Sequence, residues 1–114
     1  MRTIIAGSRS ITDPGIIRAA IRKSELVITE IVCGCAAGVD RLGEKYGNLN
    51  NIPVAQYPAE WDKYGKSAGY RRNVVMAENA DALIAIWDGK SSGTKHMIDI
   101  AKSKGLCVKV WIYE

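Results

Sequence analysis

Short apolar runs rich in Ile and Val alternate along the chain with amphipathic stretches of helical spacing, and this alternation limits the possible folds more than any other feature. It predicts a strand followed by a helix four times, and then a closing strand. Such alternation produces right-handed crossovers and hence a parallel sheet. We therefore expect an α/β fold, a Rossmann-like three-layer sandwich whose parallel five-stranded sheet has the order 3-2-1-4-5. Residues 1–114 have the length of a single domain, with no linker or internal repeat.

The predicted strands cover residues 3–6, 27–32, 52–57, 81–87 and 106–113. Four helices are predicted. The first begins near Pro14, the second begins near Val39, the third includes Val74–Ala80, and the fourth runs from Thr94 to about Ser103. The first, second and fourth strands are nearly continuous apolar runs, as is typical of strands covered on both faces. Thr12 or Asp13 is the expected N-cap of the first helix, and Gly105 is the expected C′ glycine of the last. Residues 58–68 are expected to form a polar connection.

Composition limits the classes of function. Three cysteines are an odd number for a disulfide framework, Cys33 and Cys35 form a C-x-C rather than a C-x-x-C, and the single histidine, His96, completes no standard zinc spacing. We therefore expect free thiols, no metal site and no cofactor. No signal peptide is evident, and no apolar run approaches the roughly 18 residues of a membrane span. These features predict a cytoplasmic protein without a membrane partner, and the net charge of +4 suits an anionic ligand.

Three loops rich in small residues follow the first, second and fourth predicted strands. In an open α/β sheet, ligands bind beyond the carboxyl ends of the strands where the strand order reverses, which here is between the first and fourth strands. We therefore expect the three loops to meet at one crevice. The ligand-binding residues that this placement predicts are Gly7, Ser8, Arg9, Gly34, Ala37, Gly38, Asp40, Asp88, Gly89, Ser91, Ser92, Gly93 and Thr94.

The chemistry of these loops suits a phosphate group. Glycine lets the backbone approach a ligand closely, and the free amides of a helix N-terminus carry partial positive charge. Arg9 can hold an anion through two nitrogens, and Ser91, Ser92 and Thr94 add hydroxyl donors. For any one loop the alternative is a simple strand-to-helix turn, with Thr94 or Asp40 as the N-cap. The sequence contains neither a Walker loop nor the G-x-G-x-x-G fingerprint.

Aromatic and cationic residues are mixed in the segment after the third strand, residues 61–73. The candidates to stack on a base or ribose are Trp61, Tyr64 and Tyr70. The candidates for a phosphate contact are Arg71 and Arg72, and we add Trp61, Arg72 and Asn73 to the predicted ligand-binding residues. The alternative is that Trp61 packs at the edge of the core, and that Lys63 and Lys66 are solvated.

Taken together, these motifs resemble those of the SLOG superfamily. Gly7-Ser8-Arg9 and the run from Gly34 to Asp40 resemble the G-S-R and S-G-x-A-x-G-I-D motifs of the DNA-processing proteins Smf/DprA. Arg72-x-x-x-Met76 and the turn at Gly93-Thr94 are similar to the R-K-x-x-M and P-G-G-x-G-T motifs of the LOG phosphoribohydrolases. The whole chain, including W-x-K-Y-G-K-x-A-G-x-x-R-N and W-D-G-x-S-x-G-T, resembles the YspA-like branch that is common in phages and mobile elements.

This resemblance implies a domain that binds nucleotides, ADP-ribose derivatives or related signals, or one that hydrolyses the N-glycosidic bond of nucleoside monophosphates. In LOG enzymes an arginine and a glutamate carry the hydrolysis, and the arginine maps to Arg72. The glutamate position is occupied here by Met97, which cannot act as an acid or a base. We therefore predict no catalytic residue, with Asp88 or Asp40 as the candidates to substitute for the glutamate.

The leading hypothesis is that the protein binds a phosphate-bearing, nucleotide-derived small molecule, either ADP-ribose-like or a cyclic nucleotide signal, and sequesters it in a phage setting. The second hypothesis is a nucleotide N-glycosidase with altered catalytic residues. The third is DprA-like DNA binding, which ranks lowest because the cations do not cluster on one helix. The resemblance also implies a homodimer or homotetramer. The helix around Val74, Val75 and Met76 is a candidate surface, although core packing explains these residues equally well.

Overall fold

The computed structural model describes residues 1–113, which form a parallel sheet between two layers of helices. The strands are β1 (Arg2–Gly7), β2 (Glu30–Cys33), β3 (Val54–Gln56), β4 (Ala82–Trp87) and β5 (Cys107–Ile112). They lie in the order β3-β2-β1-β4-β5, and every neighbouring pair is parallel. The predicted sheet order and the α/β class are therefore confirmed.

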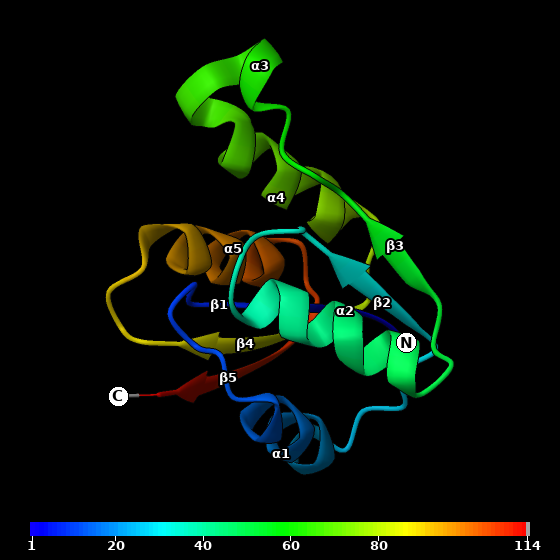
Figure 1. Cartoon of the computed structure of the whole chain (residues 1–114). Coiled ribbons are helices and arrows are strands. Elements are labelled where there is room, and N and C mark those ends of the chain that lie inside the picture. The colour runs from blue at the N-terminus through cyan, green and yellow to red at the C-terminus, as the bar shows by residue number, and fades with distance from the viewer. Residues whose placement is uncertain (114) are drawn as a thin grey trace.

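Two helices cover each face of the sheet (Figure 1). Helices α1 (Pro14–Ser24) and α2 (Val39–Leu49) pack on one face, and α4 (Ala68–Glu78) and α5 (Ser92–Ser103) on the other. The short helix α3 (Trp61–Tyr64) and the 3-10 turn η1 (Gly65–Ser67) project beyond the sheet at the start of α4. Within residues 1–113, no helix combines the length and the apolar character needed to cross a membrane.

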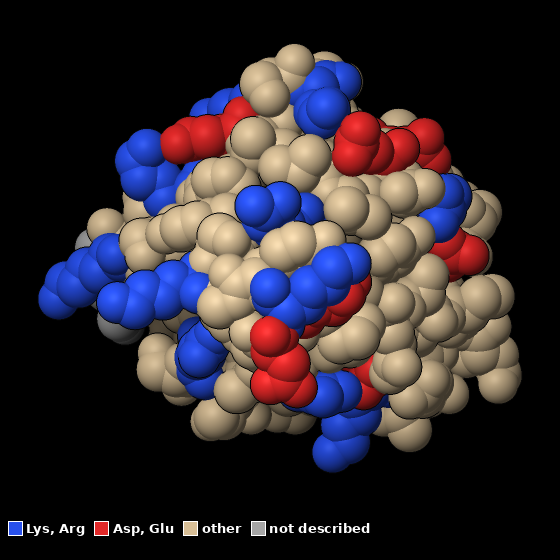
Figure 2. Space-filling view, turned by 90° about the horizontal axis from the view of Figure 1, so that it is seen from above, with Lys and Arg blue, Asp and Glu red and all other residues tan. Residues whose placement is uncertain are grey.

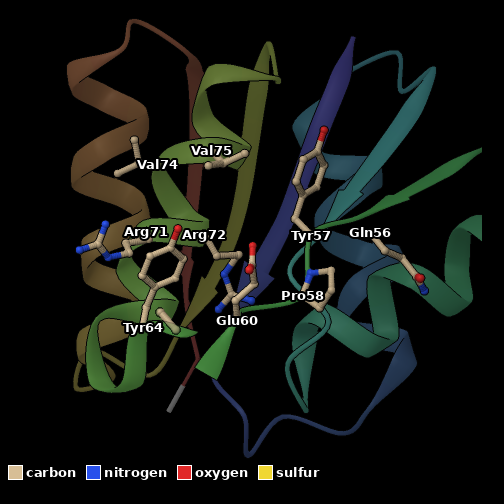
Figure 3. A pocket seen from close by; sticks show the side chains of 10 residues that line it. Gln56, Tyr57, Pro58, Glu60, Tyr64, Arg71, Arg72, Val74 and Val75 are labelled. Atoms are coloured by element: carbon tan, nitrogen blue, oxygen red, sulfur yellow. The ribbon is translucent and has the colours of Figure 1, made fainter. Parts of the chain in front are cut away.

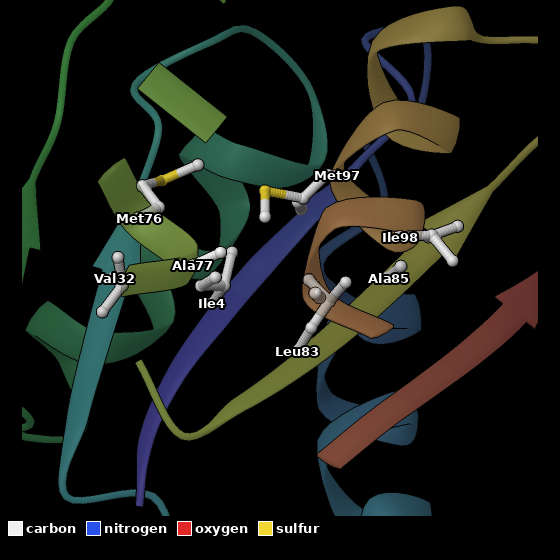
Figure 4. Close-up of a cluster of buried hydrophobic side chains, with 10 residues drawn as sticks. Ile4, Val32, Met76, Ala77, Leu83, Ala85, Met97 and Ile98 are labelled. Atoms are coloured by element: carbon white, nitrogen blue, oxygen red, sulfur yellow. The ribbon is translucent and has the colours of Figure 1, made fainter. Parts of the chain in front are cut away.

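The core is divided by the sheet into two clusters because successive side chains of a strand point to opposite faces. On β1, Ile4 packs toward α4 and α5, whereas Ile5 packs toward α1 and α2. Figure 4 shows the first of these clusters, in which Leu83 and Ala85 of β4 meet side chains of both helices. The central strands β1 and β4 are buried along almost their whole length, as their apolar runs predicted.

Several predicted boundaries differ from the structure. β2 begins at Glu30 rather than at residue 27, and Val27 is 76% exposed because the chain reaches the sheet only after residue 29. β3 is limited to Val54–Gln56 because the residues before it turn out of α2, where the Ile52 amide donates to the Gly47 carbonyl at 2.9 Å. The connection expected over residues 58–68 contains α3 and η1, since the amides of Lys63 and Tyr64 donate to the Glu60 carbonyl.

Two predicted helix caps are confirmed and two are wrong. The Asp13 carboxylate accepts a hydrogen bond from the Gly15 amide at 2.9 Å at the start of α1. Gly105 follows α5 with a φ of +77°. Asp40 and Thr94, by contrast, lie inside the first turns of α2 and α5, whose N-caps are Gly38 and Ser91. The two side chains are therefore available for other contacts.

Two glycines let α2 lie unusually close to the sheet. A Cβ at Gly43 would come within 2.9 Å of two carbons of Ile5 on β1. A Cβ at Gly47, one turn later, would come within 2.7 Å of Val54 and 2.9 Å of Ile31. These neighbours belong to strands that cannot shift freely. The close packing of α2 therefore fixes the position of the loop that precedes it.

We expect Gly43→Ala to lower the free energy of unfolding by about 1–2 kcal/mol, because overpacking against Ile5 outweighs the higher helix propensity of alanine. Gly93→Ala is the matched control. Gly93 also lies in a helix, but no neighbouring atom stands within 4 Å of the point where a Cβ would lie. That variant is expected to keep or slightly raise the stability. Urea denaturation of both variants measures the difference, and equal stabilities would contradict the close packing of α2.

Candidate functional site

Ser8, at the carboxyl end of β1, joins the three loops that the sequence predicted to meet. Its amide donates to the Ile86 carbonyl at 3.1 Å, its carbonyl accepts from the Val39 amide at 3.3 Å, and its hydroxyl accepts from the Asp88 amide at 3.0 Å. The residue is 1% exposed, so these bonds form away from water. Ser8 therefore ties the loops after β2 and β4 to the end of β1.

Gly38 allows the second loop to pass directly over the first. Its φ is +73°, a conformation that residues with a Cβ rarely adopt. A Cβ at this position would lie 2.4 Å from the Ser8 carbonyl oxygen and 2.6 Å from the Arg9 Cα. The close approach brings Arg9 and the start of α2 to the same edge of the sheet.

Three adjoining hollows open at this edge, and Arg9 and Arg72 line all three. We call the three together the crevice. The inner hollow, about 70 Å³, lies between the ends of β1 and α5 and includes Gly7, Asp40 and Thr94. The second, about 340 Å³, runs along the loop after β2 to Trp61. The third, about 280 Å³, lies between Trp61 and the N-terminus of α5.

Arg72 crosses from α4 to the loop after β2. Its Nη1 donates to the Gly34 carbonyl, and its Nε donates to the Asn73 side chain at 3.1 Å. A Cβ at Gly34 would come within 2.7 Å of the Asp40 carboxylate and within 2.9 Å of the Arg72 guanidinium. Both charged groups therefore converge over Gly34, and any side chain there would displace them.

Asp40 is a buried carboxyl group at the wall of the inner hollow. It is 6% exposed, and its Oδ2 accepts a hydrogen bond from the Ala36 amide at 3.4 Å. Burial raises the pKa of Asp40 to about 6, although Arg72 and the nearby backbone amides oppose this rise. Within residues 1–113, Asp40 is the only carboxylate that lines the crevice.

Asn73 holds the third loop against α4. Its Nδ2 donates to the Gly93 carbonyl at 3.3 Å and lies 3.2 Å from Nδ1 of His96, while its Oδ1 accepts from Arg72. The His96 ring packs against Tyr70, with the ring centroids 4.5 Å apart. Asn73 is therefore occupied by protein contacts that position Arg72 and the start of α5.

The N-terminus of α5 faces the crevice. Ser91, Gly93 and Thr94 line the inner hollow, and the Ser91 and Thr94 hydroxyl oxygens are 3.2 Å apart. Ser91 is the N-cap, and within the described residues its side chain makes no capping bond to a helix amide. The partial positive charge of this helix end adds to that of the two guanidinium groups.

The structure places twelve of the sixteen predicted ligand-binding residues in the crevice lining. They are Gly7, Arg9, Gly34, Ala37, Asp40, Trp61, Arg72, Asn73, Ser91, Ser92, Gly93 and Thr94. Of the other four, Ser8 and Gly38 shape the loops that form the crevice, and Asp88 and Gly89 belong to a turn outside its lining. The Asp88 carboxylate accepts from the Lys90 and Ser91 amides at 2.8 Å, and these bonds lower its pKa.

Trp61 is half-exposed at 51% and lines two of the hollows, so part of its side chain is open to the crevice. Lys66 and Arg41 also line the crevice, although no sequence pattern selected Arg41, and Lys66 was expected only to be solvated. Tyr70 lines the third hollow together with Trp61. The mixture of aromatic and cationic residues in 61–73 was the sequence signal for the part of the crevice lining that contains Trp61, Lys66 and Tyr70.

The floor of the inner hollow is apolar. Met76 of α4 and Met97 of α5 line it, and each is 1% exposed (Figure 4). Met76 therefore belongs to the core rather than to an outer surface of α4. Met97 occupies the position at which the LOG resemblance implies a glutamate. Its thioether side chain packs in the core instead of offering a carboxylate.

A larger hollow, about 670 Å³, lies between α4 and the end of the edge strand β3 and shares Arg72 with the crevice (Figure 3). Tyr57, Tyr64, Val74 and Val75 line it, and Val75 is 44% exposed. Arg71 also lies here, with its guanidinium 4.4 Å from the centre of the Tyr64 ring. Arg72 lines both this hollow and the crevice, whereas Arg71 lines only this hollow among those described.

Comparison with known proteins finds a family match for the part of the chain that contains the first two loops of the crevice. The profile of the YspA, cpYpsA-related SLOG family matches residues 1–64, more than half of the chain. The Gene 61 protein of Mycobacterium phage D29 is 31% identical over 84 residues, which are 68% of this chain and 67% of that protein. No solved structure is a significant match. The profile match includes the loops after β1 and β2, whereas Arg72 and the start of α5 lie beyond it.

The buried carboxyl of Asp40 predicts a specific dependence of stability on pH. Because the folded state raises its pKa from 3.8 to about 6, the folded state favours the protonated form. This contribution to stability is complete below the unfolded pKa and is lost as the pH rises through about 6. Asp40→Asn carries no such proton, so we expect the variant to gain about 1–1.5 kcal/mol relative to the unmodified protein between about pH 5 and pH 7.5.

Urea denaturation of both proteins across this pH range measures the effect. The difference between the two pH profiles isolates Asp40, because other titrating groups such as His96 are present in both proteins. Parallel profiles would show that the Asp40 pKa is not raised by burial.

Proposed function

The chain belongs to the YspA, cpYpsA-related SLOG family, and on that basis we propose that it binds a phosphate-bearing, nucleotide-derived small molecule in the crevice. The observation that carries this proposal is the convergence of Arg9, Arg72 and the N-terminus of α5 on one set of adjoining hollows. These groups supply more positive charge than the single carboxylate of Asp40 can balance. An anionic ligand would restore that balance.

The inner hollow and the N-terminus of α5 suit the phosphate group. Its lining offers the Ser91 and Thr94 hydroxyl groups, and Gly93 leaves the backbone open to close approach. The Arg72 guanidinium is already oriented by Gly34 and Asn73, so it needs little reordering to meet the ligand. Arg9, which is exposed, can approach the same anion from the loop after β1.

The two outer hollows suit a ribose and a base. Trp61 and Tyr70 both line the third hollow, and their rings offer stacking surfaces of the kind that bases use. The combined size of the hollows exceeds what a free phosphate needs. An ADP-ribose-like molecule or a cyclic nucleotide signal therefore fits the arrangement better than inorganic phosphate.

Binding without hydrolysis is favoured over a nucleotide N-glycosidase. Glycoside hydrolysis ordinarily uses two carboxyl groups on either side of the scissile bond. Asp40 is the only carboxylate in the crevice lining within residues 1–113, and Met97 adds an apolar floor. A protein that holds a nucleotide signal without breaking it would sequester it, and the phage origin of the Gene 61 protein agrees with such a role.

DNA binding remains the least favoured alternative. Figure 2 shows Lys and Arg side chains spread over one face of the molecule, with acidic side chains between them. Nonspecific DNA binding depends on many phosphate contacts along a continuous basic surface. The dispersed charges on this face do not provide such a surface.

We expect Arg72→Gln to weaken binding of the preferred ligand by roughly 10- to 100-fold, because a charge-assisted contact is lost. Arg71→Gln is the matched control, since Arg71 is the adjacent arginine of α4 but packs on Tyr64 outside the crevice. Calorimetry against ADP-ribose, its cyclic forms, AMP and NAD measures both affinities. Equal losses in the two variants would remove Arg72 from the site, and no binding of any of these ligands would overturn the proposed function.

Incubating the protein with the same ligands distinguishes binding from hydrolysis. After prolonged incubation at high protein concentration, chromatography should recover each ligand intact and detect no ribose 5-phosphate. Release that disappears in Asp40→Asn would instead support the glycosidase.

The hollow in Figure 3 is the proposed surface for the homo-oligomer that the family resemblance implies. Its apolar lining includes Tyr57, Val74 and the exposed Val75, on the outer side of α4. Apolar surface of this kind is typical of contacts between protein chains.

Val75→Asp is expected to shift the protein toward the monomer in light-scattering measurements, because the contact would bury an unpaired charge. Val27→Asp, at a more exposed valine outside this hollow, serves as the control and should leave the oligomeric state unchanged. A monomeric unmodified protein at high concentration would contradict this assignment.

A further inference from the structure

Two cysteines and one glutamate gather below the loop that follows β2. The Sγ atoms of Cys33 and Cys35 and a carboxylate oxygen of Glu44 all lie within 4.8 Å of one another. Cys33 is fully buried at the end of β2, whereas Cys35 and Glu44 are partly exposed. The crevice chemistry described above uses none of these three side chains.

The surrounding groups already orient all three side chains. The Cys35 amide donates to the Cys33 sulfur at 3.2 Å, a contact that becomes stronger when the sulfur carries negative charge. Cys35 has a φ of +63°, which turns its amide back toward Cys33. The Glu44 carboxylate accepts from Arg41 at 3.0 Å and from Gln56. Such supporting hydrogen bonds are the usual second layer around a metal ion.

We propose that Cys33, Cys35 and Glu44 form a binding site for a thiophilic divalent cation of the zinc class. In a tetrahedral zinc site, bonds of about 2.0–2.3 Å place neighbouring ligand atoms roughly 3.3–3.8 Å apart. The observed limit of 4.8 Å is wider than this spacing, so the side chains would have to rotate to close around an ion. The inference goes beyond the proposed function and does not depend on it, because no nucleotide contact enters the argument.

Charge supports this choice of ion. Two thiolates and one carboxylate carry three negative charges, which a divalent ion and the adjacent Arg41 guanidinium together neutralise. Two sulfur ligands favour zinc or cadmium over magnesium or calcium, which prefer oxygen. Three protein ligands leave one tetrahedral position open, and Cys35 lines the crevice, so solvent can fill that position.

Binding of the ion is an exchange of protons for metal with no redox change. In the free protein the Cys33 thiol donates to the Asp40 carbonyl at 3.6 Å, and the Cys35 thiol donates to the Cys33 carbonyl at 3.8 Å. Each sulfur then gives an electron pair to the cation, both S–H bonds break, and the two protons pass to the buffer. The Glu44 carboxylate is already ionised, so it adds its electron pair without releasing a proton.

The test is a titration of the full chain with cadmium chloride, after treatment with a chelator and reduction with a phosphine. The expected result is one equivalent of bound cadmium, a thiolate-to-cadmium absorption band in the ultraviolet and the release of two protons per ion. No ultraviolet band, or a band without one-to-one stoichiometry, would overturn the proposal.

Three variants assign the ligands. Cys35→Ser should lower the intensity of the band by about half and weaken binding at least tenfold, and Glu44→Gln should keep the band but weaken binding roughly tenfold. Cys107→Ser removes the remaining free thiol, which lies on β5, and should change neither quantity. Circular dichroism checks that each variant is folded. Full-strength binding by both Cys35→Ser and Glu44→Gln, or loss of the band in Cys107→Ser, would also overturn the site.

Discussion

The hydrogen bonds of the buried Ser8 connect the end of β1 with the loops after β2 and β4 at the carboxyl edge of the sheet. One residue bonds to the end of β4 through its amide, to the start of α2 through its carbonyl and to Asp88 through its hydroxyl. Gly38 makes this arrangement possible, since a side chain there would collide with the Ser8 carbonyl. This buried junction connects the loops that carry Arg9, Asp40 and Asp88.

Much of the fold could be predicted because it depends on local patterns. The β-branched runs of β1 and β4 and the cap at Asp13 are signals that act over a few residues. The sheet order followed from the handedness and connectivity of strand–helix units rather than from any single residue. The boundaries of β2 and β3 were less predictable, because pairing with neighbouring strands, not the apolar run itself, decides where those strands begin.

The meeting of the three loops could be predicted from the sequence, whereas the contacts of the candidate site could be predicted only in part. Glycine-rich loops after parallel strands indicate where a ligand binds, and most of the predicted residues do line the crevice. A sequence does not reveal which way a side chain turns. Asp88 bonds to its own turn, and Asp40 points inward from α2 instead of capping it. Glu44 approaches the two cysteines from α2, the helix that packs closely on β1 at Gly43, and the sequence alone does not reveal this approach.

The projecting segment of α3 and η1 would set a thermodynamic limit on recognition of a base in the proposed complex. No residue of this described segment is buried, although it carries Trp61, so local opening of the segment requires little free energy. A ligand that stacks on Trp61 must therefore spend part of its interaction energy on ordering these residues. In the proposed complex, the edge of the sheet would impose no such cost on the phosphate. Selection among ligands would then depend more on the anion, and variation in the base would alter affinity gradually.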